Sequence, residues 1–524
     1  MPDLTATRDL NTLSATDLAG ALRAGEVSAR EAVEAHIRRV EEVNPKLNAV
    51  IFTLFDEALR EAAAADARRL AGEALGPLHG VPITVKECQG LAGSPWTIGL
   101  TNRKGQACAE DGVHVARLRA AGAIVLGKGN IPQFMMSSEC DNPVYGRTNN
   151  PWDLGRAPGG SSGGDAAIVA AGGAAFGLGG DIGGSLRNPA HVCGISTLKP
   201  TSRRLASIGA FDPNDRQEAM PAQSGPLARS VADLARVMDV LAAPGLEDVD
   251  FSVPPVPWRD PAAVDVSKLR IGFYEEDSFY PASPAIRRAV REAAAALRAR
   301  GAEVEPWQPP HVERFLHFWL MFIGGDGGEG LLEAAAGSTL DYRMERMLKI
   351  ARLNPLLRGY FRWKATRSGQ RVIMPYLDIR EISLCAYNRI LEERRGLVRE
   401  VMADWRQRRF DAILCPPAPL AALTHGSTAD LGPSHAGAAY YNVLGVPAGV
   451  VAATRVRPGE ESDRPETRDI CLAAARKVEQ GSAGLPVGVH VAARHWREDI
   501  VLAVMGALEE HFRAQPDYPL RPPI

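Results

Sequence analysis

Apolar positions near the start of the chain recur with the period of a helix. In "SAREAVEAHIRRV", which begins at Ser28, every third or fourth residue is apolar and falls on one helical face. Ser28 and Glu31 have the spacing of a capping box, in which two side chains satisfy free N–H groups of the first turn. We therefore expect residues 1–75 to form an N-terminal helical region packed on the core. The apolar residues of this face are Val33, Ile37 and Val40.

From about residue 80 the pattern changes to short apolar runs that alternate with helical stretches. The helical "DGVHVARLRAAG" (111–122) lies between two such runs, and "SPAIRRAVREAAAALRARG" lies between two more. This alternation is typical of an α/β fold, in which helices cover a sheet. We assign residues 76–515 to one domain built in this way. The runs with strand character are "GVPITV" (80–85), "AIVLG" (123–127), "AAFGLGG" (174–180), "LRIGFY" and "AEVEPW".

Composition and charge exclude several classes of protein. Hydrophobic residues make up 45% of the 524 residues, and 60 Lys and Arg residues balance 62 Asp and Glu residues, so we expect a globular protein without a nucleic-acid partner. Seven scattered cysteines without CxxC pairs favour neither a disulfide framework nor a zinc site. No stretch reaches the roughly 18 to 20 apolar residues of a spanning helix, and the first residues do not resemble a signal peptide. We expect a cytoplasmic location.

A glycine-rich stretch with three serines, "APGGSSGGDAAIVAAGGAAFGLGGDIGGSLRNPA", runs from Ala157 to Ala190. A phosphate-binding loop explains it poorly. The nearby "GAIVLGKG" (122–129) has the GxxxxGK spacing, but Gly129 stands where a Ser or Thr would bind magnesium, and the intervening residues are expected to be strand.

A Ser-His-Asp hydrolase is a second explanation. The residues around Ser161 satisfy GxSxG, but the turn-forming "NNPWDLGRAP" precedes them, whereas a nucleophile elbow follows a strand. His191 is a candidate base for such a triad, although a lone histidine is more often structural.

A third explanation is a serine hydrolase whose base is a lysine, a variant of nucleophile activation. Lys86 stands at the end of the strand-like "VPITV", where the chain would present it. A lysine flanked by apolar residues can lose its proton when it is buried, and the neutral amine is a usable base. Taken alone, Lys86 would be interpreted as a solvated surface lysine.

Lys86 is not alone, because three segments together resemble the core motifs of the amidase signature family. These are "GVPITVKE", "GGSSGGD" and "GGDIGGSLRNPA", which occur in the family's order, with Ser161 and Ser185 at the family's separation of 24 residues. The resemblance implies an amide hydrolase with a Ser-Ser-Lys triad and no metal or cofactor. It also implies the fold of that family, a mixed twisted β-sheet core sandwiched between α-helices.

By resemblance, Ser185 is the nucleophile, Ser161 the bridging serine joined by a cis peptide, and Lys86 the base. Lys86 would take a proton from Ser161, which takes one from Ser185 as it attacks the carbonyl, and the reversed relay would protonate the leaving amine. The oxyanion needs convergent backbone N–H donors where no bulky side chain blocks the approach. We expect these donors on the segment Ile182, Gly183, Gly184 and Ser185.

Three neighbouring residues are expected to have supporting roles. Asp181 is expected to brace the loop before the nucleophile, with a solvated turn aspartate as the alternative. Arg187 fits the family's Gly-Ser-x-Arg pattern and is expected to pin the following helix. Ser162 either assists the relay or donates a hydrogen bond to the loop.

Flanking segments resemble vertebrate fatty acid amide hydrolases, a group within this family, from about residue 75 to 512. Met135 matches a position that contacts acyl inhibitors and substrates in that group, although a methionine beside apolar residues is otherwise a core filler. Two departures stand out: Gly180 replaces a threonine, and the N-terminal membrane helix of the vertebrate enzymes has no match here. The segments are "NIPQFMMSSECDNPVYGRTNNPW", "LRIGFYEEDSFYPASPAIRRAV", "AAYYNVLGVPAGVVAATRV" and "GLPVGVHVAARHWREDIVL".

The stretch 349–371, "KIARLNPLLRGYFRWKATRSGQR", mixes aromatic and leucine side chains with seven basic residues. That composition suits a headgroup surface, and the stretch falls where the related enzymes carry their membrane cap. We expect a membrane or substrate cap with peripheral membrane contact. A helix packed on the body or on another copy of the chain is the alternative, and a homodimer is expected.

These observations predict a hydrolase of carboxamides with lipophilic or fatty acyl groups, acting through an acyl-enzyme. Esters are a further candidate substrate class. Three alternatives remain open: an amidase for small aliphatic, aryl or peptide C-terminal amides, an amidotransferase subunit bound to partner chains, and a non-catalytic binding protein with the same fold.

Overall fold

The computed structural model describes residues 9–210 and 217–524, and the first residues of the predicted N-terminal region lie outside this range. Its described strands form one mixed sheet of 11 strands in the order β1-β3-β2-β4-β6-β5-β10-β11-β9-β7-β8. Strand β2 is parallel to β3 and β4, and β7 is parallel to β8 and β9, while the other pairs are antiparallel. The bounds are β1 Val50–Thr53, β2 Pro82–Lys86, β3 Ile124–Gly129, β4 Phe176–Asp181, β5 Ser196–Lys199, β6 Gln223–Ala228, β7 Arg270–Phe273, β8 Glu303–Pro306, β9 Ala412–Cys415, β10 Ala448–Arg455 and β11 Pro486–Ala493.

Helices cover both faces of this sheet, which confirms the predicted α/β architecture. Close approach is possible where glycines replace side chains: His191 of α6 lies over Gly488, and Met505 of α17 lies over Gly449 on the opposite face. The helices are α1 Ala15–Ala24, α2 Ala29–Leu47, α3 Phe55–Leu70, α4 Val113–Ala120, α5 Gly163–Ala170, α6 Arg187–Cys193, α7 Val231–Leu241, α8 Pro284–Ala299, α9 Val312–Gly324, α10 Glu329–Ala334, α11 Tyr342–Ala351, α12 Pro355–Arg367, α13 Leu384–Gln407, α14 Thr428–Leu431, α15 Ala436–Leu444, α16 Ile470–Glu479 and α17 Glu498–Arg513.

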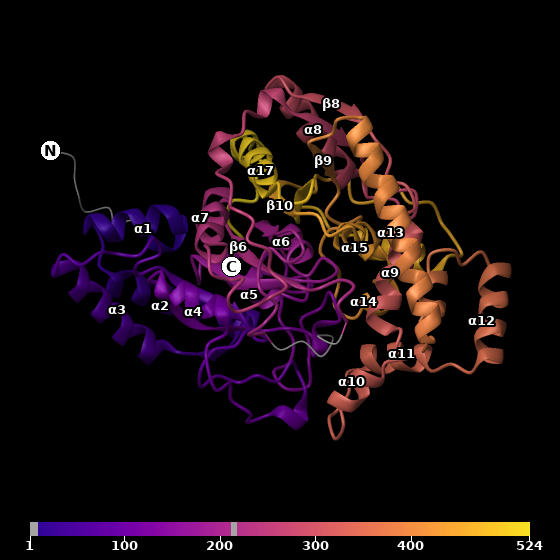
Figure 1. Cartoon of the computed structure of the whole chain (residues 1–524), viewed down its shortest axis with the longest axis horizontal. Coiled ribbons are helices and arrows are strands. Elements are labelled where there is room, and N and C mark those ends of the chain that lie inside the picture. Colours follow the sequence, from indigo (N-terminus) through magenta and orange to yellow (C-terminus); the bar gives the residue numbers. More distant parts are fainter. Residues whose placement is uncertain (1–8, 211–216) are drawn as a thin grey trace.

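The N-terminal helices lie together at one end of the molecule (Figure 1). Helix α2 begins with the predicted capping box, since the Ser28 hydroxyl accepts from the N–H of Glu31 and the Glu31 carboxylate accepts from the N–H of Ser28. Asp233 of α7 accepts the N–H groups of Ala15 and Thr16, which ties α1 to the body. The region also supplies an edge strand, β1, to the sheet. A division of the chain at residue 75 into two units stays a prediction.

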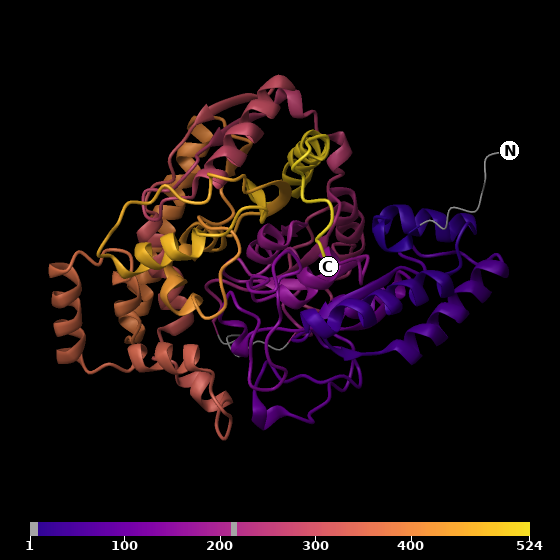
Figure 2. The ribbon, with the colours of Figure 1, turned by 180° about the vertical axis from the view of Figure 1, so that it is seen from behind.

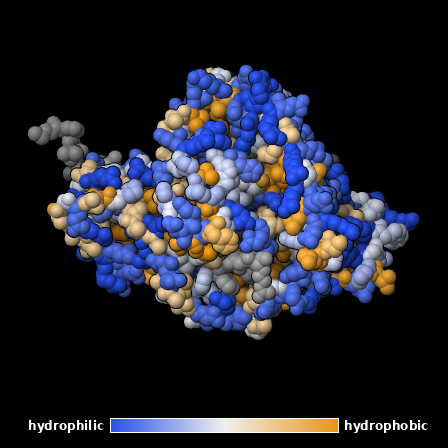
Figure 3. Space-filling model, viewed as in Figure 1, coloured by the Kyte–Doolittle hydropathy of each residue, from blue (hydrophilic) through white to orange (hydrophobic). Residues whose placement is uncertain are grey.

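Helix α12 stands at the opposite end of the molecule, away from the sheet, in both ribbon views (Figures 1 and 2). The segment 349–371, which we predicted as one unit, belongs to two helices. Helix α11 ends at Ala351, and α12 begins at Pro355. Asn354 caps the new helix by accepting the N–H of Leu356. On the face shown in Figure 3 hydrophilic residues predominate, and one of the scattered hydrophobic groups lies over α12.

Candidate active site

Lys86 and Ser161 are in direct contact. The lysine is the last residue of β2 and is 2% exposed, and its Nζ donates to Ser161 Oγ over 2.8 Å. The same Nζ donates to the Gly180 carbonyl over 3.4 Å. Lys86 is therefore a buried amine with a serine hydroxyl as its partner, and the solvated surface lysine is excluded.

The loop that carries Ser161 needs glycine on steric grounds. The peptide bond between Gly160 and Ser161 is cis, as the resemblance predicted. A Cβ at Gly159, which has a φ of +77°, would lie 2.7 Å from the backbone of Pro189, and a Cβ at Gly160 would lie 2.2 Å from the Ser137 carbonyl oxygen. Backbone from helix α6 and from the loop at Ser137 thus packs directly on this turn.

Ser185 lies in the loop between β4 and α6, and this loop is joined to the loop of Ser161. The N–H of Ser162 donates to the carbonyl of Ser185 over 3.1 Å. The Ser162 hydroxyl donates to the Gly180 carbonyl and accepts from the Gly180 N–H, so its bonds are structural. Helix α5 and strand β4 separate the two serines along the chain, and β4 lies where the strand-like run 174–180 predicted a strand.

Asp181 braces the loop before the nucleophile, as expected from its position. Its carboxylate accepts the backbone N–H groups of Gly184 at 2.8 Å and Leu186 at 3.1 Å. Arg187 and Asn442 bind the same carboxylate from the other side. Burial alone would raise the pKa of Asp181, but the charge and hydrogen bonds of Arg187 lower it well below the usual range, so Asp181 is an anion.

One of the four predicted oxyanion donors is already engaged, because the N–H of Gly184 donates to Asp181. Within the described residues, the N–H groups of Ile182, Gly183 and Ser185 have no acceptor. These three N–H groups are therefore available to a ligand.

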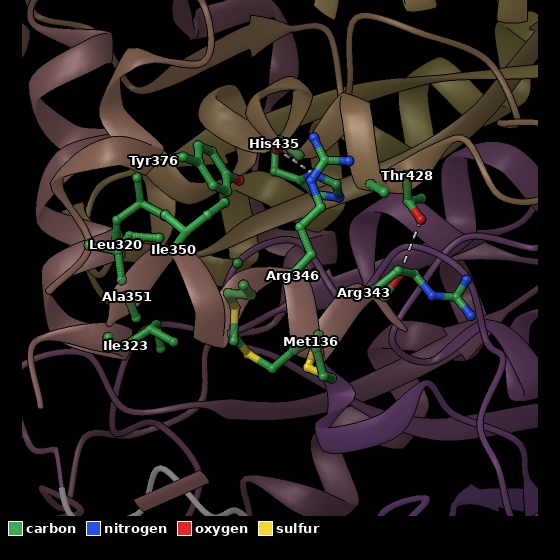
Figure 4. Close-up of a pocket in the computed structure, with 18 of the residues that line it drawn as sticks. Met136, Leu320, Ile323, Arg343, Arg346, Ile350, Ala351, Tyr376, Thr428 and His435 are labelled. Carbon is green, nitrogen blue, oxygen red and sulfur yellow. Dashed lines mark hydrogen bonds between the residues drawn. The ribbon is translucent and has the colours of Figure 1, made fainter. Parts of the chain in front are cut away.

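Ser185 lies in the wall of an apolar cavity. Figure 4 shows part of the lining of this cavity. In the view of Figure 4, Leu320, Ile323, Ile350 and Ala351 line the left side, while Arg343 and Thr428 lie on the right. Helix α11 supplies more of the lining than any other element, and α9, α10 and the 3-10 helix Met374–Asp378 also contribute to it. The predicted contact residue Met135 lies in this wall. The apolar lining residues are Met135, Met136, Ile182, Trp319, Leu320, Ile323, Leu331, Met344, Met347, Leu348, Ile350, Ala351, Ile373, Ile379, Ala429 and Pro433.

A second cavity meets the same nucleophile from the other side and has a more polar lining. Met135, Met136, Ile182 and Ser185 border both cavities, so Ser185 stands between an apolar chamber and a polar one. The polar residues that line the second cavity are Lys86, Gln89, Ser161, Asp181, Arg203, Ser207, Gln217, Glu218, Gln223, Ser224, Asp250 and Ser252.

The competing motifs have structural roles. Lys128, in the GxxxxGK match, lies within β3 and donates to the Pro95 carbonyl. His191 is fully buried, bonded through Nε2 to the Leu420 carbonyl and through Nδ1 to the Gly488 N–H. Burial lowers the pKa of His191 to about 4. Neither Lys128 nor His191 is hydrogen-bonded to Lys86 or Ser161.

Sequence reasoning missed Asn442 of α15 and His435. Asn442 donates to Asp181 and accepts from Arg187, and His435 is hydrogen-bonded to Ser138 at the wall of the apolar cavity. Both come from segments more than 250 residues after their partners, and no local pattern marks them. In the described residues no group of three or more His, Cys, Asp or Glu side chains could hold a metal ion, and no helix there is long and apolar enough to span a bilayer.

Several known proteins are similar to this chain. The fatty-acid amide hydrolase 1 of Sus scrofa is 33% identical over 496 residues, which are 93% of this chain and 84% of the relative. A solved fatty acid amide hydrolase superposes with a TM-score of 0.85 at 25% identity, covering 96% of this chain and 85% of that one. A glutamyl-tRNA(Gln) amidotransferase subunit of Chloroflexus aggregans is 39% identical, over 62% of this chain and 66% of its own length.

The family model "Amidase" matches residues 31–502. This span contains β2, the loops of both serines and every helix around the apolar cavity. The chain belongs to the amidase signature family and is an amide hydrolase.

Proposed function

We propose that the chain hydrolyses lipophilic carboxamides through a Ser-Ser-Lys triad. The observation that carries the proposal is the buried hydrogen bond between Lys86 Nζ and Ser161 Oγ, because it pairs an amine base with the hydroxyl that the relay requires. The bond between the Ser162 N–H and the Ser185 carbonyl holds the two serine loops against each other.

In the proposed mechanism, neutral Lys86 accepts the Ser161 proton while Ser161 accepts the proton of Ser185. Ser185 Oγ bonds to the carbonyl carbon, and the carbonyl electron pair moves to oxygen. The free N–H groups of Ile182, Gly183 and Ser185 are the donors that would stabilise this oxyanion. The proton then returns along the relay to the amine nitrogen, the C–N bond breaks, and water releases the acid from Ser185.

The two cavities suggest how the substrate lies. The apolar lining of the first cavity favours an acyl chain, because each buried methylene contributes about 0.8 kcal/mol. The polar lining of the second favours the amine. The names and coverage of the fatty acid amide hydrolases support this assignment, and the amidotransferase relative matches a smaller part of the chain. Small amides and esters remain the alternative substrates.

A series of N-acyl p-nitroanilides from acetyl to oleoyl tests the substrate class. We expect kcat/KM to rise with chain length, and a maximum at acetyl would instead favour the small-amide alternative. Ser185→Ala should abolish both turnover and fluorophosphonate labelling, and Lys86→Ala should abolish turnover. Ser196→Ala, in buried β5 and outside both cavities, is the matched control. Full turnover by Ser185→Ala or Lys86→Ala would contradict the triad.

We also propose that α12 lies on a membrane surface. It exposes Leu356 at 84% and Trp363 at 53%, with Lys364 and Arg367 in its last turn. This combination suits the boundary between headgroups and acyl chains. Helix α12 is flanked along the chain by α11 and the 3-10 helix, which both line the apolar cavity, so a lipid substrate would have a short path.

Co-sedimentation with phosphatidylcholine and phosphatidylserine vesicles tests this contact. The double variant Leu356→Ser with Trp363→Ser should lose binding. The control Leu70→Ser, at a leucine of α3 that is 76% exposed, should keep it. Equal sedimentation of both variants would contradict the proposal. A concentration-dependent dimer that the double variant abolishes would show instead that another copy of the chain covers α12.

A further inference from the structure

Trp319 of α9 lies against the loop that carries the proposed oxyanion donors. Its indole Nε1–H donates to the carbonyl oxygen of Ile182 over 2.8 Å. A Cβ at Gly183 would lie 2.7–2.8 Å from three indole atoms, Cζ2, Cε2 and Nε1. The ring is therefore in van der Waals contact with the peptide that joins Ile182 and Gly183.

This contact sets the direction of an oxyanion donor. The carbonyl of Ile182 and the N–H of Gly183 belong to one planar peptide group, and in a trans peptide they point in opposite directions. A hydrogen bond that holds the carbonyl toward Trp319 therefore aims the N–H away from the ring. Accepting that bond also polarises the peptide and strengthens its N–H as a donor.

Trp319 is also part of the wall of the apolar cavity, beside Leu320 and near Ile323 on the same helix. It is only partly buried, so part of the ring faces the cavity space. An acyl chain in this cavity would cover the ring and restrict its motion. The side chain that holds the oxyanion peptide is thus one that the substrate's acyl chain would contact.

We propose that Trp319 is a positioning residue that couples occupation of the apolar cavity to the oxyanion site. A chain packed on the indole keeps Nε1–H on the Ile182 carbonyl, and this bond holds the Gly183 N–H on the oxyanion. Long acyl groups then raise kcat as well as lowering KM. The inference rests on the proposed function, because it assumes that Ser185 attacks an amide whose acyl chain fills this cavity.

The test compares wild type with Trp319→Phe, which keeps an aromatic ring and removes the donor. For oleoyl p-nitroanilide we expect kcat to fall about 10- to 1,000-fold with KM within about threefold. For the acetyl substrate the fall should be smaller, so the rise of kcat with chain length should flatten. The control is Trp307→Phe, which also removes an indole hydrogen bond, to Asp404, outside both cavities. It should leave both profiles unchanged.

A second variant keeps the test independent of packing. Benzothienylalanine at position 319 keeps the shape of the indole and replaces the N–H by sulfur, so it should reproduce the Trp319→Phe result. A kcat for oleoyl p-nitroanilide within twofold of wild type in both variants would overturn the inference. Absence of fluorophosphonate labelling and amide turnover in the wild-type protein would instead overturn the proposed function, which distinguishes the two failures.

Discussion

Lys86 and Ser161 are 75 residues apart in the chain and are joined by a hydrogen bond of 2.8 Å. The contact forms because β2 and β4 are neighbouring parallel strands, so that Lys86 at the end of β2 lies beside the loops around β4 and α5. Both residues are almost fully buried at the border of the polar cavity. The proposed chemistry follows from this pairing.

Removing the bridging hydroxyl should affect amides more than esters. In Ser161→Ala no group relays the proton of Lys86 to the leaving amine, and an amine is a poor leaving group without that proton. We expect kcat/KM for a long-chain amide to fall about 10²- to 10⁴-fold, with a smaller fall for the matched ester. Steady-state kinetics on such a pair of substrates measures this. Equal losses for both substrates would argue against a relay to the leaving group.

A methyl group at position 183 should disable the site. In Gly183→Ala the new Cβ would stand 2.7 Å from the ring of Trp319, whose N–H is bonded to the neighbouring carbonyl, so the loop has to shift. We expect a loss of about 10²-fold or more in kcat, because oxyanion donors act only when well aligned. Gly506→Ala on α17, where a Cβ meets nothing within 4 Å, is the control and should stabilise the protein by about 0.5–1 kcal/mol. Wild-type kcat in Gly183→Ala would contradict the contact.

Asn442 should matter for both stability and activity. In Asn442→Ala, Asp181 loses a donor and Arg187 loses an acceptor in a fully buried site. Because such groups are left without a hydrogen-bond partner, we expect the free energy of unfolding to fall by about 1–3 kcal/mol. Equilibrium unfolding in urea measures this loss. Asp181 also holds the loop that carries the proposed oxyanion donors. We therefore expect kcat to fall together with the free energy of unfolding. A variant as stable and as active as wild type would contradict this role of Asn442.

Asp165 should make stability depend on pH. It is fully buried on α5, close to the hydroxyl of Thr84. Burial raises the pKa of Asp165 to about 7, although Thr84 and the charges of Lys86 and Lys128 act in the opposite direction. The contribution of Asp165 to stability is therefore complete below the ordinary carboxyl pKa and is lost as the pH rises to about 7.

The variant Asp165→Asn carries no ionisable group at this site. The difference in unfolding free energy between Asp165→Asn and wild type should change in favour of the variant as the pH rises from about 4 to about 8, by up to about 4 kcal/mol. Thermal and urea unfolding at several pH values measures this change. A difference in unfolding free energy that stays constant over that range would contradict this role of Asp165.

Local signals predicted the parts of the fold that depend on neighbouring residues. The capping box of Ser28 and Glu31, the strand ending at Lys86 and the strand predicted at 174–180 all appear in the structure where the sequence indicated. A prediction of this kind works because hydrogen bonds within a turn and alternation along a strand involve residues close in the chain. The break at Pro355, by contrast, was not predicted within the segment 349–371.

What the sequence determined by itself is the family, the α/β class and the identity of the proposed triad, because these rest on short motifs and on the order in which they occur. The tertiary structure alone decided that Asn442 braces Asp181, that Trp319 bonds to Ile182 and that Ser185 stands between two cavities. The two hydrogen bonds join residues far apart in the chain, and the walls of the two cavities likewise come from distant segments. The packing of α9 and α15 around the sheet brings Trp319 and Asn442 to the loop before Ser185. No pattern of neighbouring residues in the sequence predicts this packing.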